Sequence, residues 1–195
     1  PWTRWAPSDW KGKSRVCTEI VDNMLGWDIT DFGSGDFPSK GLIMLTLRNG
    51  SLKKKEYPKN YAEKVLIVRE SQVTPMHFHW SKMEDIINRG GGNLIVTLYR
   101  RTPDEQLSQE DVTFSMDGIR HTVKAGTKVI LKPGDSITLE PELYHLFYGE
   151  PGKGTILVGE VSSVNDDTCD NRFLDPLPRF PEIEEDEPPK YLLAF

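Results

Sequence analysis

Short β-strand segments separated by turn residues constrain the fold of this chain more than any other feature of its sequence. From Gly41 onward, apolar runs rich in β-branched and aromatic residues recur at close spacing, bounded by Gly, Pro, Asn and Asp. Three turn signals stand between them, at Asn49-Gly50, Asp117-Gly118 and Pro133-Gly134-Asp135. Strands are expected at 42–48, 64–69, 93–99, 112–116, 119–123, 128–131, 136–139, 144–148 and 155–161. This pattern predicts an all-β barrel or sandwich.

The two ends of the chain differ from this strand-rich middle. Apolar residues at helical spacing from Val16 to Leu25 predict a helix that starts near Ser8 or Asp9 and stops at Gly26. The last stretch is rich in Pro and acids but carries aromatic and leucine anchors, so it is expected to wrap around the barrel as irregular structure. We therefore expect one domain over 1–195, with a helical extension at 1–40, a barrel at 41–165 and a C-terminal wrap at 166–195.

Composition narrows the classes of partner. A formal net charge of −6 and a pI near 5.3 argue against nucleic acid and anionic membrane. No apolar run approaches the ~18 residues of a membrane-spanning helix, and no signal-peptide pattern is visible at the start. Two cysteines, Cys17 and Cys169, do not make a disulfide framework, so reduced thiols and a cytoplasmic location are expected.

Three of the four histidines fall into a pattern typical of a divalent-metal site. His77 and His79, two apart on a strand, project to the same face. Glu84 lies five residues after His79, an odd number, so on one unbroken strand it would point to the opposite face. A turn at 80–83 would instead place Glu84 on a neighbouring strand, beside the two histidines. His145 adds an imidazole from a distant segment, and such a ligand set suits Zn, Mn, Fe, Co or Ni. The alternative is two solvated strand histidines with unrelated Glu84 and His145, which the scarcity of histidine here disfavours.

This ligand set, spread over short strands, resembles that of the cupin superfamily. The first cupin motif is matched in spacing at His77, His79, Glu84 and Gly91. The second motif is looser, since Gly149 stands where a terminal Asn is usual, and this departure indicates a particular branch. The resemblance implies a single cupin (jelly-roll) β-barrel, here with an N-terminal helix and a C-terminal irregular wrapping segment.

The branch resembles the D-lyxose isomerase family in the stretches 74–92, 159–167, 171–173 and 179–187. The resemblance implies a Mn²⁺-type ion on the four candidate ligands, with Zn²⁺, Co²⁺, Ni²⁺ or Fe²⁺ as alternatives. It also implies interconversion of D-lyxose with D-xylulose and of D-mannose with D-fructose, as free monosaccharides. A homodimer is implied as well, in keeping with the way β-barrels cover open edge strands.

An aldose–ketose isomerase must move a proton between two sugar carbons, and a metal-bound Glu84 would not be free to do so. Lys64 matches the position of an active-site lysine of the family; otherwise it is a solvated strand-end lysine. Glu182, the first acid after a turn anchored by an aromatic residue, is the candidate base, against the alternative of a solvated acidic tail. A hydride shift between the carbons stays open as the other route.

Three further residues are candidates for sugar binding. Asp170 and Arg172 are candidates for hydroxyl recognition, the alternative being ordinary loop capping. Trp80 shares the face of the histidine pair, where it would either stack on a sugar ring or pack. Two other functions remain open for such a barrel, a cupin dioxygenase and a non-catalytic sugar-binding cupin. The acidic, polar tail suits a polyhydroxylated substrate better than an aromatic one.

Overall fold

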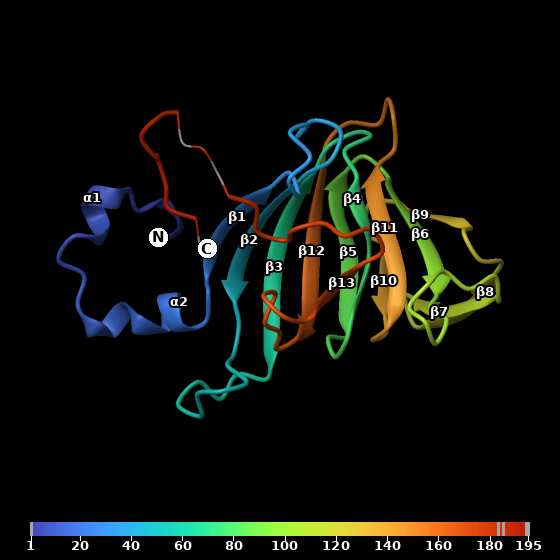
Figure 1. Ribbon diagram of the computed structural model, residues 1–195, viewed down its shortest axis with the longest axis horizontal. Helices are drawn as coiled ribbons and strands as arrows, with labels where there is room; N and C mark the ends of the chain where they lie inside the picture. The colour runs from blue at the N-terminus through green and yellow to red at the C-terminus, as the bar shows by residue number, and fades with distance from the viewer. Residues whose placement is uncertain (1, 183, 185, 194–195) are drawn as a thin grey trace.

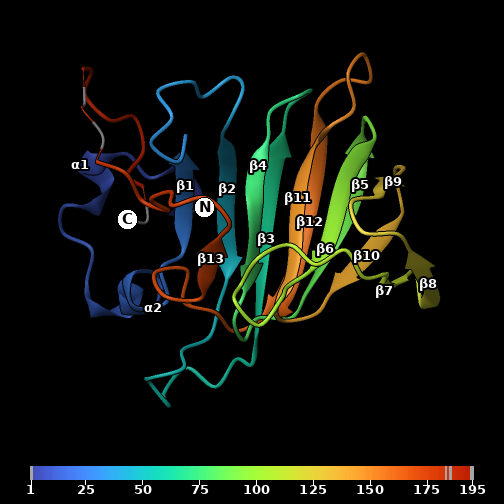
Figure 2. The ribbon, with the colours of Figure 1, turned by 45° about the vertical axis from the view of Figure 1, so that its right-hand side comes forward.

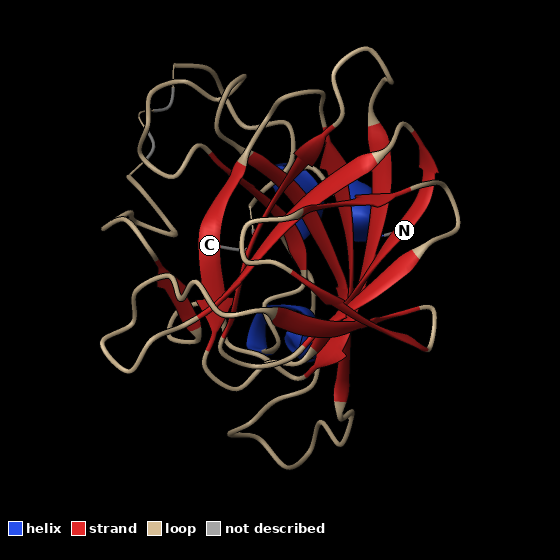
Figure 3. Cartoon of the chain, turned by 90° about the vertical axis from the view of Figure 1, so that its right-hand side faces the viewer, coloured by secondary structure: helices blue, strands red, loops and turns tan. Residues whose placement is uncertain are grey.

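The computed structural model describes residues 2–182, 184 and 186–193 and consists mostly of two antiparallel sheets that face each other (Figure 1, Figure 3). The eight-stranded sheet has the order β1-β2-β3-β12-β5-β10-β7-β8, and the five-stranded sheet has the order β13-β4-β11-β6-β9. The strands are β1 Gly26–Thr30, β2 Leu42–Arg48, β3 Tyr61–Val68, β4 Thr74–His79, β5 Glu84–Gly91, β6 Leu94–Arg100, β7 Val112–Met116, β8 Ile119–Val123, β9 Lys128–Leu131, β10 Ser136–Leu139, β11 Leu143–Gly149, β12 Ile156–Ser163 and β13 Asn171–Phe173. The predicted all-β, cupin-like architecture is confirmed.

The core lies between the sheets and is built by strand alternation. On β3, Leu66 and Val68 are buried on either side of half-buried Ile67, and on β12 Ile156 and Val158 are buried on either side of exposed Leu157. The same inward rows carry polar side chains toward one part of the sandwich, where the functional site lies. The buried apolar cluster comprises Phe32, Leu42, Met44, Leu66, Val68, Ile86, Leu94, Val96, Leu98, Val112, Phe114, Leu131, Ile137, Leu139, Leu143, Phe147, Ile156, Val158 and Phe173.

The strand predictions agree closely with the structure. The strands at 42–48, 112–116, 119–123, 128–131 and 136–139 have the predicted bounds, and the other four differ by a few residues at their ends. Strands β4 and β5 were expected only from the spacing of the metal-ligand candidates. Strands β1 and β13 were not predicted, because each is short and lies in a segment assigned to another structure.

Two of the three predicted turns have the expected role. Asp117 and Gly118 join β7 to β8 with φ angles of +50° and +79°, the left-handed values of a tight hairpin turn. The Pro133 to Asp135 turn connects β9 to β10, which belong to different sheets. At Asn49-Gly50 only the tight turn is wrong: β2 and β3 pair antiparallel as in a hairpin, but a long loop joins them. There the Asn49 amide donates to the Asn165 carbonyl oxygen at 3.1 Å, so it ties two loops together.

The predicted N-terminal helix is present, but as short pieces rather than as one continuous helix. The segment forms two short helices, α1 Pro7–Trp10 and α2 Thr18–Asp22, with 3₁₀ turns at Trp2–Arg4 and Arg15–Cys17. Val16 is 90% exposed and Val21 is 68% exposed, so the apolar spacing does not produce a buried helical face. Figure 1 shows these pieces at one end of the molecule, beyond β1. Strand β1 itself lies within the predicted helical extension and pairs with β2.

The C-terminal segment runs back across the sandwich, as Figure 2 shows in orange and red. Its strand β13 pairs with β4, and Leu193 forms a bridge with Trp27 on β1. Ile183 and Glu185, in the acidic run, lie outside the described residues. None of the described helices is long and apolar enough to cross a membrane. Cys17 and Cys169 are free thiols.

Candidate metal centre and active site

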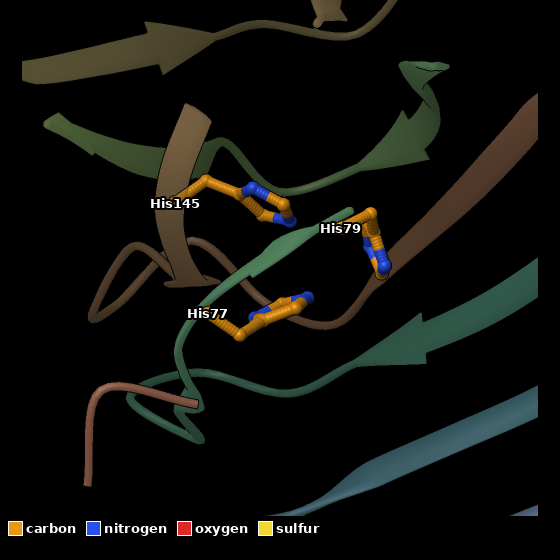
Figure 4. Close-up of side chains that lie close together, drawn as sticks. All are labelled: His77, His79 and His145. Carbon is orange, nitrogen blue, oxygen red and sulfur yellow. The ribbon is translucent and has the colours of Figure 1, made fainter. Parts of the chain in front are cut away.

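Three histidines converge between the sheets from two neighbouring strands. His77 and His79 lie two apart on β4, and His145 on β11 is the direct cross-strand partner of His77. Their ring centroids are 4.1 Å apart for His77 and His145 and 5.1 Å apart for His77 and His79. Figure 4 shows the rings turned toward one another. All three are buried, and one nitrogen from each lies within 4.8 Å of the other two, a spacing that a single ion can bridge.

The hydrogen bonds of the rings leave nitrogen lone pairs for a ligand. The Nδ1 atoms of His77 and His145 lie 2.7 Å from the Pro75 carbonyl oxygen and 2.9 Å from the Leu143 carbonyl oxygen. These contacts place the proton on Nδ1 and leave Nε2 as the acceptor. The His145 Nε2 is buried without a hydrogen-bond partner among the described residues. A buried acceptor in this state is costly, and a divalent cation would satisfy it, so the residues fit a metal.

Glu84 reaches the histidines from the opposite sheet. Its Oε1 lies 3.4 Å from His79 Nε2 and 3.2 Å from His145 Nε2. The turn at 80–83 therefore carries the chain from β4 in one sheet to β5 in the other, rather than to a paired neighbour of β4. The other carboxylate oxygen of Glu84 lies 2.6 Å from Lys82 Nζ. Burial raises the pKa of Glu84, but Lys82 and His79 outweigh it and hold that pKa well below its usual range.

A buried chain of charges continues from the metal-ligand candidates. Lys82 Nζ also donates to Glu160 Oε1 at 3.0 Å, and Lys64 Nζ lies 3.3 Å from the same oxygen. Lys64 donates in addition to Asp167 Oδ2 at 3.1 Å. Burial lowers the pKa of Lys82, but Glu160 and Glu84 outweigh it, so the pKa is raised and the group is charged. Lys64 is 2% exposed, so it is not a solvated strand-end lysine.

Arg179, from the C-terminal segment, borders the same pocket. Its guanidinium forms an ion pair with Asp28 on β1 and lies 4.0 Å from Asp167 Oδ2. The pocket thus combines paired charges with apolar walls, a mixture suited to a small polar ligand that also has an apolar face. Its apolar lining consists of Phe32, Leu42, Met44, Leu66, Ile86, Phe147 and Phe173.

The structure places the other sequence-predicted residues outside this lining. Trp80 is 40% exposed, and Arg101 lies 5.9 Å from its ring. Arg172 is half-buried and donates to Glu105 at 2.6 Å. Glu182 is exposed. Of the residues predicted for catalysis or sugar binding, only Lys64 lines the pocket.

Sequence reasoning assigned no role to several residues of the pocket. The alternation of buried and exposed residues along a strand could have identified Glu160. It follows Ile156 and Val158 among the inward-facing residues of β12, where a charged residue is unusual. Lys64 stands in the same kind of row on β3. The missed residues that line the pocket with charge are Lys82, Glu160, Asp167 and Arg179.

Replacing Asp167 with Asn should destabilise the fold in a pH-dependent way. Burial raises the pKa of Asp167, but Lys64 and Arg179 outweigh it and hold the pKa well below its usual range. Its stabilising contribution is therefore fully present above the unfolded-state pKa of about 3.9 and is lost as pH falls through the folded-state pKa. At neutral pH we expect the free energy of unfolding to fall by about 3 kcal/mol, which is at the low end for a broken buried ion pair. The loss is limited because Lys64 is still paired with Glu160 and Arg179 is still paired with Asp28.

Chemical denaturation at several pH values measures this difference in unfolding free energy. The difference should shrink as the pH is lowered below about 4. Asp111→Asn is the control, because the ion pair of Asp111 with Lys124 is exposed and should contribute little. A loss in Asp167→Asn no larger than that in the control would contradict the expectation.

A sandwich of two antiparallel sheets with a buried histidine cluster between them defines a cupin-like protein with a candidate metal centre. The fold is similar to solved L-ribose isomerases. The Cellulomonas parahominis enzyme without ligand aligns with a TM-score of 0.55 at 16% identity, covering 82% of this chain and 82% of that chain. The Acinetobacter sp. DL28 enzyme in complex with L-ribose aligns with a TM-score of 0.51 at 17% identity, covering 70% and 71%. At such identities the likeness concerns the fold alone.

The D-lyxose isomerase family model matches residues 1–195. A D-lyxose/D-mannose isomerase from Serratia proteamaculans is 55% identical over 195 residues, which is 100% of this chain and 86% of that protein. The protein of the same name from Escherichia coli O157:H7 is 52% identical over the same shares of both chains. The chain belongs to the D-lyxose isomerase family, so the predicted resemblance is confirmed.

Proposed function

We propose that the protein is a metal-dependent aldose–ketose isomerase that interconverts D-lyxose with D-xylulose and D-mannose with D-fructose. Support comes from relatives named D-lyxose/D-mannose isomerase that are 55% and 52% identical over the whole chain. The observation that carries the proposal is the buried histidine cluster, of which His77 and His79 line one pocket. Glu84, Lys64, Glu160 and Lys82 line the same pocket. We retain the homodimer as an expectation of the family resemblance.

The ion would be held by His77, His79, His145 and Glu84, a set of three imidazoles and one carboxylate. This donor set accepts Mn²⁺, and also Zn²⁺, Co²⁺, Ni²⁺ or Fe²⁺. When bound, such an ion supplies a Lewis acid that polarises sugar oxygens and stabilises negative charge on them.

The chain's own residues would move the protons. By the proton-transfer route, isomerisation requires a base that takes a proton from C2 of the aldose and returns it to C1. Two buried carboxylates of the pocket, Glu160 and Asp167, are not metal-ligand candidates. Of these, Glu160 shares Lys82 with the ligand candidate Glu84, and a hydrogen bond from Lys82 and an ion pair with Lys64 fix its orientation. Lys64 and Lys82 present ammonium groups that can donate to the sugar oxygen that gains negative charge. Glu182, which is exposed, would have to move to reach the sugar.

Formation of ketose from D-lyxose and D-mannose, supplied with Mn²⁺ and without O₂, tests the proposal. Turnover under these conditions separates an isomerase from a cupin dioxygenase, which needs O₂, and from a non-catalytic sugar-binding protein. D-mannose should be a much better substrate than mannose 6-phosphate. The reason is that the cations lining the pocket, Lys64, Lys82 and Arg179, are each already paired with a carboxylate. Absence of ketose from every free aldose in a panel would refute the isomerase, and a preference for the phosphate would refute the free-sugar assignment.

A further inference from the structure

The Asp170 side chain is buried and is bound by the turn that separates two metal-ligand candidates. Its Oδ1 accepts hydrogen bonds from the Ser81 backbone N–H at 2.9 Å and from the Ser81 hydroxyl at 2.8 Å. Its Oδ2 accepts one from the Lys82 backbone N–H at 3.1 Å, and its carbonyl oxygen accepts one from the Trp80 N–H at 3.0 Å. Three consecutive backbone N–H groups therefore point at this one residue. Asp170 is not among the residues that line the pocket.

The turn held in this way sets the geometry of the proposed metal centre. It begins directly after His79 on β4 and ends at Glu84 on β5, so it spans the gap between the two sheets. Hydrogen bonds from N–H groups to a buried carboxylate are about twice as strong as those between neutral groups. A fixed turn keeps Glu84 facing the histidines and keeps the Lys82 ammonium on the Glu84 carboxylate.

The His79 ring gives a second, independent observation. His77 and His145 each have a backbone carbonyl within hydrogen-bond distance of Nδ1. The Nδ1 of His79 is buried and has no hydrogen-bond partner among the described residues. It lies 3.9 Å from Asp170 Oδ2, just beyond hydrogen-bond distance. A carboxylate behind a metal-binding imidazole fixes the orientation and tautomer of the ring, and Asp170 stands where such a group is needed.

We propose that Asp170 is a positioning residue of the metal centre, which clamps the 80–83 turn and serves as the outer partner of His79. This assignment replaces the hydroxyl-recognition role suggested by the sequence. It rests on the proposed function in one respect, namely that His79 and Glu84 hold the ion. Strand β13 strengthens the clamp, because Asn171, the next residue, is the cross-strand partner of His79.

The test compares Mn²⁺ affinity, sugar kinetics and stability of the metal-free protein in wild type, Asp170→Asn and Asp175→Asn. Asn keeps the size of Asp170 but removes its charge and turns one acceptor into a donor. Asp175, an exposed acid of the same segment, is the matched control. Competition with a chromogenic chelator should show Mn²⁺ affinity about 10–100-fold weaker in Asp170→Asn and unchanged in the control. At saturating Mn²⁺ the KM for D-mannose should be that of the wild type.

Unchanged Mn²⁺ affinity with a raised KM would overturn the proposal in favour of hydroxyl recognition. A lower melting temperature of the metal-free variant with unchanged Mn²⁺ affinity would overturn it in favour of a purely structural role. If Asp170→Asn does not fold, Ser81→Ala, which removes one contact to Asp170, should weaken Mn²⁺ binding by a smaller factor, and equal affinity would count against the clamp. A wild-type protein that binds Mn²⁺ but isomerises no aldose would refute the proposed function, while the affinity comparison would still test Asp170.

Discussion

Replacing His145 with Ala should remove bound metal and isomerase turnover together. His145 supplies one of three imidazoles in the cluster. Its Nε2 has no hydrogen-bond partner in the described part of the chain and lies 3.2 Å from Glu84 Oε1. Loss of a direct ligand should weaken Mn²⁺ binding by more than the 10–100-fold typical of outer-sphere changes. Metal content of the purified variant, measured by mass spectrometry, and ketose formation at fixed Mn²⁺ are the two measurements.

His121 provides the matched control for this substitution. It is the one histidine of the chain outside the cluster, and it lies exposed on β8, where its ring stacks on Phe114. His121→Ala should keep both metal and activity. Full metal occupancy in His145→Ala would show that the cluster is not the metal centre, whereas loss of metal from both variants would indicate a general loss of folding.

Replacing Glu160 with Gln should lower kcat by about 10²–10⁴-fold while metal and sugar still bind. The loss should fall on kcat rather than on KM, because a base acts in the transition state. The fold should tolerate the change, because Lys64 remains paired with Asp167 and Lys82 remains paired with Glu84. Incorporation of solvent tritium into the product should fall in parallel if the reaction proceeds by proton transfer.

Glu182→Gln is the matched comparison, because Glu182 was the base predicted from sequence and is exposed. It should have a kcat near that of the wild type. Lys64→Ala should keep the metal and lose kcat, since Lys64 lines the pocket. If Glu182→Gln loses kcat and Glu160→Gln does not, the acidic segment must approach the pocket in the working enzyme, and Glu160 serves only to balance charge.

The sequence predicted the parts of the site that depend on local periodicity. His77 and His79 share a face because strand residues two apart always do, whatever the rest of the fold. Glu84 was expected beside them on a neighbouring strand, and it does lie beside them, but on a strand of the opposite sheet. A turn between paired strands and a turn between sheets use the same residue types, so the sequence alone does not separate them.

Pairing between distant residues explains what the sequence did not predict. Glu160 and Lys82 are buried because each compensates the charge of the other, and nothing near either residue in the chain signals the contact. The N-terminal segment forms short helices rather than one long helix for a different reason. Its apolar spacing suggested one long amphipathic helix, but Gly12 adopts a left-handed φ of +85° between the two short helices that form instead.

The placement of the ligand candidates on both sheets means that a bound ion would also act as a cross-link. His77, His79 and His145 belong to the five-stranded sheet and Glu84 to the eight-stranded sheet, so one ion would tie the two layers through the middle of the sandwich. An ion that binds only the folded chain adds about 2.7 kcal/mol of stability at a concentration 100 times its Kd. The two cysteines of the chain are free thiols, so a bound ion would provide a cross-link of the kind that a disulfide provides in other proteins. Removing the ion with a chelator would then weaken the packing of the two sheets as well as stop catalysis.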